Sequence, residues 1–252
     1  MNKITISGNL TSDAEVRMVN TNGKDTNVTS FTIAVSEGHD KTGFWRCNLW
    51  NREKLAQYLT KGKPVLIDGR AEPRSYEKDG VKRNVIDISV NNIELLGRRP
   101  YANNLELHGR LTRDAEIRET NGDSVVVSYG LAVTKPWHTD TPWYFNISEF
   151  IKKDAKCLDV VKNSYKRGTP VYVTGRLYEN RYQNENGEER RRYEVRAANS
   201  MLTSAKDGEA QETDASTTQV PNQTPTSADP KVKDPNEGFV NLPDGLEDEL
   251  PF

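Results

Sequence analysis

The chain has 252 residues, of which 34% are hydrophobic, and a mean hydropathy of −0.81. This is low for a fully packed protein, so part of the chain is expected to lie outside any core. Residues 1–99 contain 16 Lys/Arg and 12 Asp/Glu, residues 100–205 contain 16 and 14, and residues 206–252 contain 3 and 11. A mildly basic body with a strongly acidic end favours a polyanion as the partner of the body.

Residue types that carry chemistry are sparse and scattered. Cys47 and Cys157 have no CxxC spacing, and no signal peptide or membrane-spanning run is evident, so we expect a cytoplasmic protein without disulfides. His39, His108 and His138 lack the spacing of metal ligands, so neither a metal nor another cofactor is predicted. The absence of a nucleophile elbow, a phosphate loop or a paired-carboxylate motif argues against an enzyme.

The sequence contains an internal repeat with a period near 100 residues. Residues 4–17, 31–35, 45–49 and 63–70 recur in the same order as residues 105–118, 129–133, 143–147 and 169–176. This period is too long for a solenoid unit and suits a small self-sufficient domain. We therefore predict two copies of one domain, at 1–99 and 100–204.

Each copy is predicted to form five strands. In the first copy, β-type alternation occupies residues 4–6, 31–35, 45–49, 65–67 and 86–90. A helix is expected between the third and fourth strands, where Leu55, Tyr58 and Leu59 follow helical spacing, and a longer one from about Glu149 to Lys166 in the second copy. This layout predicts an all-β protein with two tandem OB-folds, which are five-stranded Greek-key barrels.

The end of the chain has a different composition. Residues 206–252 hold six of the twelve prolines, and their only aromatic residues are Phe239 and Phe252. Such a segment cannot bury enough apolar surface to offset its ordering entropy. Residues 205–252 are therefore predicted to form a disordered acidic tail.

Strand parity predicts an exposed aromatic surface on the third strand of the first copy. Trp45 belongs to an apolar set that should face inward, which leaves Phe44, Arg46, Asn48 and Trp50 facing outward. Two aromatic rings beside an arginine can stack bases and contact phosphate. The alternative is burial of these rings against another subunit. We favour core or subunit contact for Trp45 and Trp143, and bases for the exposed rings.

A basic hairpin with an aromatic residue follows in each copy. Arg74 and Tyr76 share parity, and Lys78, Lys82 and Arg83 flank a turn at Asp79 and Gly80. In the second copy the aromatic positions move, with Trp137 where the first copy has His39. The residues predicted to contact single-stranded DNA are Lys3, Arg17, His39, Phe44, Arg46, Trp50, Arg74, Tyr76, Arg110, Trp137, Tyr144, Arg176, Tyr178 and Tyr182.

Residues 3–10, 13–17, 31–36, 44–50 and 62–69 together resemble the bacterial single-stranded DNA-binding protein family. The last residues, Asp248, Glu249, Leu250, Pro251 and Phe252, resemble that family's acidic tail. The resemblance implies the tandem form, in which a homodimer supplies four OB domains. It also maps the family's base-stacking positions onto His39, Phe44, Trp50 and Tyr76, whereas His39 and Ser148 depart from the aromatic pattern.

The resemblance implies a protein that binds single-stranded DNA without strong sequence preference and protects it. The five terminal residues would recruit replication, recombination and repair proteins, and the protein would be nucleoid-associated and encoded by a bacterium, plasmid or phage. A rival hypothesis is an adaptor whose barrels bind protein. That hypothesis explains the acidic tail but leaves the outward aromatic and basic residues of both barrels unexplained.

Overall fold

The computed structural model describes residues 1–21, 23–38, 41–78, 81–98, 101–137, 140–183 and 189–203. The predicted tail at 205–252, with its terminal partner-binding residues, lies outside the described residues, and so does His39. The described part of the chain is built mainly of strands. No helix within it is long and apolar enough to cross a bilayer.

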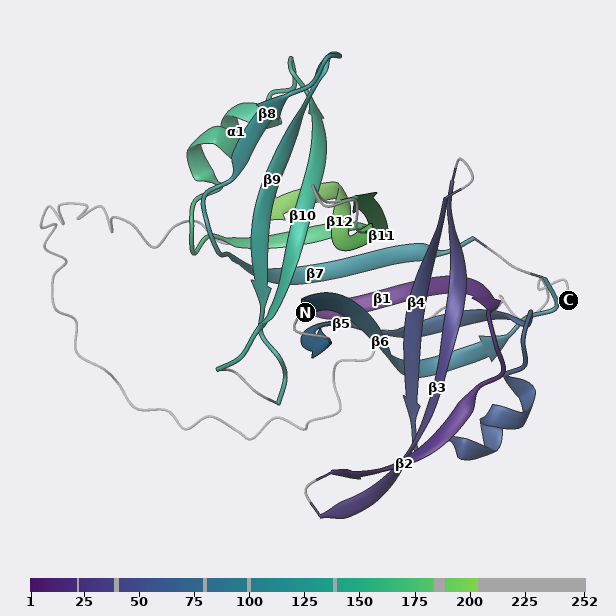
Figure 1. Cartoon of the computed structure of the whole chain (residues 1–252). Helices are drawn as coiled ribbons and strands as arrows, with labels where there is room; N and C mark the ends of the chain where they lie inside the picture. Colours follow the sequence, from purple (N-terminus) through teal and green to yellow (C-terminus); the bar gives the residue numbers. More distant parts are fainter. Residues whose placement is uncertain are drawn as a thin grey trace, which may run out of the picture. The chain divides into compact units, whose positions relative to one another are not determined.

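The first copy forms a closed barrel (Figure 1). Its elements are β1 (Asn2–Leu10), β2 (Glu15–Thr21), β3 (Lys24–Gly38), β4 (Lys41–Trp50), the short helix η1 (Glu53–Tyr58), β5 (Pro64–Lys78) and β6 (Val81–Leu95). Strand β1 closes the barrel because it pairs with both β5 and β3. The five predicted strands are all present, and β2 is an additional strand that pairs with β3.

The second copy repeats this arrangement. Its elements are β7 (Asn103–Leu111), β8 (Glu116–Glu119), β9 (Ser124–Val133), β10 (Trp143–Lys152), α1 (Cys157–Ser164), β11 (Pro170–Gln183) and β12 (Glu189–Leu202). Among the described residues the strand order is β2-β3-β4-β6-β5-β1-β7-β11-β12-β10-β9-β8, which reads as a mirror image about β1 and β7. The prediction of two tandem OB-fold barrels is therefore confirmed.

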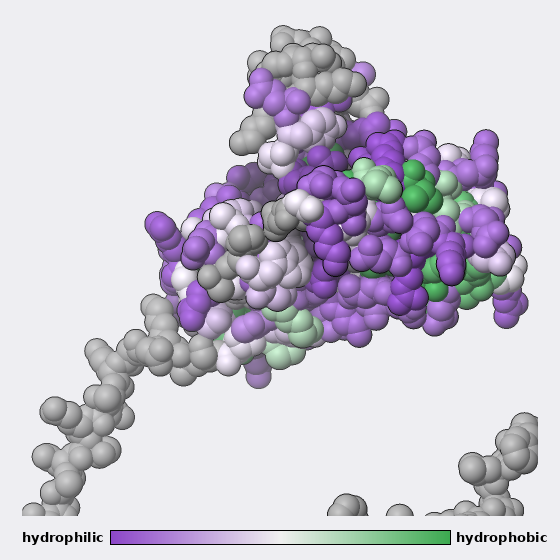
Figure 2. Space-filling view, turned by 90° about the horizontal axis from the view of Figure 1, so that it is seen from below, coloured by the Kyte–Doolittle hydropathy of each residue, from purple (hydrophilic) through white to green (hydrophobic). Residues whose placement is uncertain are grey.

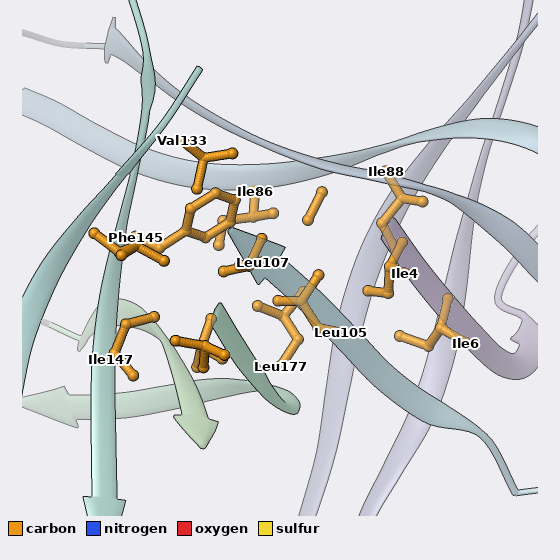
Figure 3. Close-up of a cluster of buried hydrophobic side chains, with 14 of the residues drawn as sticks. Ile4, Ile6, Ile86, Ile88, Leu105, Leu107, Val133, Phe145, Ile147 and Leu177 are labelled. Atoms are coloured by element: carbon orange, nitrogen blue, oxygen red, sulfur yellow. The ribbon is translucent and has the colours of Figure 1, made fainter. Parts of the chain in front are cut away.

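Period-two alternation produces the core. Trp45, Cys47 and Leu49 on β4 are at most 3% exposed, as their parity predicts. Buried residues of both barrels belong to one hydrophobic cluster, which continues from Ile4 on β1 to Leu105 on β7 (Figure 3). The packing of each barrel is thus continuous with that of the other.

The two barrels are joined by an antiparallel pairing of β1 with β7, from Asn2 opposite Leu107 to Ile6 opposite Asn103. An asparagine supports each side of this junction. Asn2 exchanges two hydrogen bonds with the backbone of Ala71, at 2.7 and 3.1 Å. Asn103 does the same with Leu177, at 2.9 and 3.0 Å. The repeated sequence thus produces the same contact twice.

A helix lies between the third and fourth predicted strands of each barrel, as expected, but the first differs from the prediction in type and the second in length. In the first barrel, η1 is a 3-10 helix of 6 residues, and Tyr58 is 54% exposed rather than part of the core. In the second, α1 has only 8 residues, because β10 continues to Lys152 through the segment that we expected to be helical. Pairing of β10 with β9 over ten residues stabilises this extension.

Candidate nucleic-acid interface

The outer face of β4 carries the exposed aromatic residues that parity predicts. Phe44 is 38% exposed and Trp50 is 42% exposed, while Trp45 between them is fully buried. Arg46 and Asn48 lie on the same face, and the Ser30 hydroxyl donates a hydrogen bond of 2.9 Å to Asn48. The two rings therefore lie at the ends of a strip with a cation and an amide between them.

Strand β2 extends this face. Arg17 is the register partner of Val28, which is in turn the partner of Trp50, so Arg17 lies in the same row as that ring. Its guanidinium pairs with Glu15, and this hydrogen bond, together with the positive charge, lowers the pKa of Glu15. Arg17 is well exposed, so its guanidinium can contact a ligand that lies over the Trp50 ring.

The β5–β6 hairpin adds the predicted basic and aromatic pair. The Arg74 guanidinium lies 5.2 Å from the centroid of the Tyr76 ring, and its Nε donates to Asp87 at 2.6 Å. Asp87 is also the register partner of Arg46 on β4. The hairpin and β4 therefore share one outer surface. The Lys78 and Lys82 side chains lie outside the described residues, whereas Arg83 is exposed.

The second barrel presents a different set of rings. Tyr144 is 63% exposed on β10 and Tyr182 is 52% exposed on β11. Tyr178 is partly covered by the Arg196 guanidinium, 4.2 Å from its ring centroid. Arg110 lies in a row with Ala132 and Tyr144 across β7, β9 and β10. These residues form an aromatic and basic face comparable to that of β4.

The remaining predicted residues lie at the junction of the barrels. Lys3 is opposite Glu106 in the β1–β7 pair, next to an acidic side chain. Arg70 of the first barrel stacks on Trp137 of the second, 4.8 Å from the ring centroid, yet Trp137 remains 53% exposed. Arg176 lies 5.6 Å from the ring centroid of Tyr101.

Sequence reasoning missed Phe150. This ring is 60% exposed and follows Tyr144, Asn146 and Ser148 on the outer face of β10. Continued alternation could have revealed it, but we expected a helix to begin at Glu149. Arg196 on β12 was also missed, because an ion pair with Glu194 and a stacked tyrosine become visible only in the folded chain.

Carboxylates fix the position of the β3–β4 hairpin against β11. Glu179 accepts a hydrogen bond from the backbone N–H of Phe44, and Glu37 accepts one from the N–H of Glu179, each of 3.0 Å. Burial, reinforced by the neighbouring Glu179 carboxylate, raises the pKa of Glu37. A Cβ at Gly43 would come within 2.2 Å of a Glu37 oxygen, so a larger residue there would displace the Glu37 side chain. Phe44 is thus held in place from both barrels.

One face of the described molecule is mostly hydrophilic, with hydrophobic residues in small separate groups (Figure 2). No group of His, Cys, Asp or Glu among the described residues could hold a metal ion. The outer surfaces instead offer rings and guanidinium groups, which recognise bases and phosphates. Fold and site together define a tandem OB-fold protein of the nucleic-acid-binding class.

Comparison with known proteins specifies this class further. The model of the Single-strand binding protein family matches residues 1–96 and again residues 102–203. The chain belongs to this family, and it is a binding protein rather than an enzyme. The family resemblance predicted from the sequence is therefore confirmed for both copies.

The curated relatives align over little more than 100 residues, about the length of one copy. Single-stranded DNA-binding protein 3 of Clostridium acetobutylicum is 38% identical over 104 residues, covering 38% of this chain and 71% of that protein. The single-stranded DNA-binding protein of Mycobacterium leprae is 38% identical over 103 residues, covering 36% of this chain and 60% of that protein.

Solved structures match over both barrels. A deletion mutant of the single-stranded DNA binding protein from Thermus aquaticus aligns with a TM-score of 0.62 and 25% identity, covering 84% of this chain and 98% of that one. The wild-type protein aligns with the same TM-score at 24% identity, which shows the shared fold.

Two tryptophans on one strand should respond in opposite ways to replacement by alanine. Trp50→Ala removes an exposed stacking face and should weaken binding of single-stranded DNA by about 1–3 kcal/mol, with little change in melting temperature. Trp45→Ala leaves a cavity in the core and should lower the free energy of unfolding by about 3–5 kcal/mol. Fluorescence titration and urea unfolding of both variants measure these effects. Early melting of Trp50→Ala with normal binding would show that Trp50 is structural.

Proposed function

We propose that this chain binds single-stranded DNA without strong sequence preference and protects it. The observation that carries the proposal is the outer face of β4 and the β5–β6 hairpin, where Phe44, Trp50 and Tyr76 are exposed beside Arg46 and Arg74. Exposed rings accept any base, because every base has a π face, and cations contact the phosphates. Membership of the Single-strand binding protein family supports the same ligand.

The proposed contacts in the first barrel are Lys3, Arg17, His39, Phe44, Arg46, Trp50, Arg74 and Tyr76. Those in the second barrel are Arg110, Trp137, Tyr144, Arg176, Tyr178 and Tyr182. Phe150 joins the second set because it extends the exposed strip of β10. Both barrels would bind, along strand paths that differ because their aromatic residues occupy different positions.

The protein should discriminate between single-stranded and duplex DNA rather than between base sequences. Tryptophan fluorescence titrations with single-stranded DNA, duplex DNA and RNA at two salt concentrations test this. We expect quenching with single strands of any composition, and an affinity that falls as salt rises because phosphate contacts release counterions. Equal affinity for duplex DNA of the same length would contradict the proposal, and binding of protein but not DNA would favour the adaptor hypothesis.

We further propose that the chain acts as a homodimer, which brings four OB domains together as in the tandem form that it resembles. Trp45 and Trp143 do not support this point, because both are buried within one chain, at 0% and 4% exposure. Multi-angle light scattering at micromolar concentration should give twice the chain mass of 28.5 kDa. A monomer at that concentration would refute the proposal.

The acidic end of the chain is proposed to recruit replication, recombination and repair proteins in a bacterial cytoplasm, at the nucleoid. Residues 206–252 hold 3 Lys/Arg and 11 Asp/Glu, so they repel phosphate. The Phe252 ring can enter an apolar pocket rimmed by basic residues, with Asp248 and Glu249 steering the encounter.

Deleting Leu250, Pro251 and Phe252 should leave DNA affinity nearly unchanged and abolish capture of such proteins from a bacterial extract. Affinity for single-stranded DNA and mass spectrometry of the captured proteins measure the two effects. A control that replaces Pro221 and Pro225, which lie in the same acidic tail upstream of the last five residues, by serine should retain capture. If the truncated protein still captured the same replication and repair proteins, the terminus would serve solubility alone.

A further inference from the structure

A cavity of about 510 Å³ lies at the junction of the two barrels. Its walls come from the β5–β6 hairpin of the first barrel and from β10 and the β11–β12 hairpin of the second. This volume is in the range of sites that hold small ligands. The two barrels are copies of one domain and are joined through β1 and β7. Each residue of the cavity wall therefore has a counterpart on the β4 side of the junction, and the two sides can be compared.

The junction on the β4 side is filled. Glu179 has a fully buried side chain, which accepts from Phe44 N and pairs with Arg181 at 3.1 Å. The Arg181 guanidinium also lies 5.4 Å from the Phe44 ring centroid. Trp45 packs against Tyr193, with ring centroids 5.5 Å apart. Large side chains therefore occupy the space between β4 and β11–β12.

The repeat places smaller residues at the corresponding positions of the other junction. From the matched registers, Pro142 corresponds to Phe44, Pro73 to Glu179, and Ser75 to Arg181. Ile86 likewise corresponds to Tyr193. All four smaller residues line the cavity. The smaller residues at these positions leave the hollow on the β10 side of the junction, and Tyr193, which packs against Trp45, also forms part of its wall.

The walls of the cavity have the chemistry of a nucleotide site. Tyr144 and Tyr182 line it and remain 63% and 52% exposed, so their rings are available for stacking. Arg74 and Arg192 line it as well and can contact phosphate. The acidic wall residue, Glu194, pairs with Arg196 at 3.0 Å, which offsets its charge.

Arg74 links this cavity to the aromatic surface of the first barrel. Its guanidinium stacks on Tyr76 and bonds to Asp87, whose register partner is Arg46 on β4. The same side chain forms part of the cavity wall that faces the second barrel. A DNA strand that leaves the β4 surface past Tyr76 therefore reaches the cavity, where Tyr144 of the second barrel forms part of the wall.

We propose that the cavity is a nucleotide subsite through which bound single-stranded DNA crosses from the first barrel to the second. A base stacks against Tyr144 or Tyr182 while Arg74 and Arg192 contact the flanking phosphates. At the other junction the buried Glu179 side chain and the Trp45–Tyr193 contact occupy the corresponding space, so the proposed crossing lies on the β10 side. This inference rests on the proposed binding of single-stranded DNA and specifies the route of the strand between the barrels.

The test fills the cavity with larger side chains that are introduced on the first barrel. The Ser75 hydroxyl donates to Asn84 Oδ1 at 2.7 Å, so replacing both by leucine removes both partners of an exposed hydrogen bond and adds apolar bulk without a ring or charge. The probe is an oligothymidine of about 35 nucleotides, long enough to cover two OB domains, with 5-iodouracil for photocrosslinking. Gln57→Leu, on exposed η1, is the matched control for added bulk.

We expect the Ser75→Leu/Asn84→Leu variant to lose about five-fold or more in affinity for the long strand, the lower end of one stacking contact. Crosslinks to Tyr144 and Tyr182 should disappear while those to Trp50 persist. Tyr144→Ala should weaken binding similarly in the wild-type background but have little further effect in the filled variant, because it then removes a contact already lost. Tyr58→Ala, a ring of similar exposure on η1, should bind normally.

The outcomes separate the two proposals. Crosslinks to Trp50 without any to Tyr144 or Tyr182 in the unaltered protein, or fully additive losses, would overturn the crossing and leave single-strand binding intact. Failure of the unaltered chain to bind the oligothymidine would overturn the proposed function itself. If circular dichroism shows that the filled variant is unfolded, Tyr144→Ala and Tyr182→Ala decide, and unchanged affinity in both would refute the subsite.

Discussion

The antiparallel pairing of β1 with β7 is the interaction on which the arrangement of the described chain depends. It satisfies the backbone groups of two strands that would otherwise form open sheet edges, and it joins the hydrophobic clusters of the two barrels. Because β7 repeats β1, a strand pairs with its own copy, and strand order becomes a mirror image about this pair. Asn2 and Asn103 stabilise the two halves through equivalent backbone contacts. Each surface residue of one barrel thereby gains a counterpart on the other.

Side chains then make the two copies different. Trp50 of the first barrel corresponds to Ser148, whereas the second barrel has Phe150 two residues further along the same face. Phe44 corresponds to Pro142, and Glu179 to Pro73, so one junction is filled and the other hollow. Under the proposed binding, a DNA strand therefore meets two unlike surfaces and one crossing between them. The proposed crossing would give the DNA a single route even though the fold is nearly symmetric.

The sequence predicted the features that depend on residues close together in the chain. It did not predict those that depend on contacts between residues far apart in the chain. Parity along β4 correctly separated buried Trp45 from exposed Phe44 and Trp50, because alternation in a strand is a local property. The length of α1 was not predictable in this way, since β10 is extended by pairing with β9, a tertiary effect that overrides helical spacing. The bond between Phe44 and Glu179 joins residues 135 positions apart, and no local pattern indicates it. The hollow at the junction required the same long-range information.

Arginine contacts with the exposed rings bear on how binding proceeds. Arg74 lies over Tyr76, Arg181 over Phe44 and Arg196 over Tyr178, each within 5.4 Å of the ring centroid. Such contacts cover part of one aromatic face and favour the ring orientation that makes them. Under the proposed binding, a base that stacks on the covered face takes the place of the guanidinium, which can then contact the neighbouring phosphate. The net gain in binding free energy is therefore the difference between base stacking with a phosphate contact and the original cation–π contact. Rings already oriented by arginine lose little conformational entropy on binding, which favours affinity without requiring a particular base.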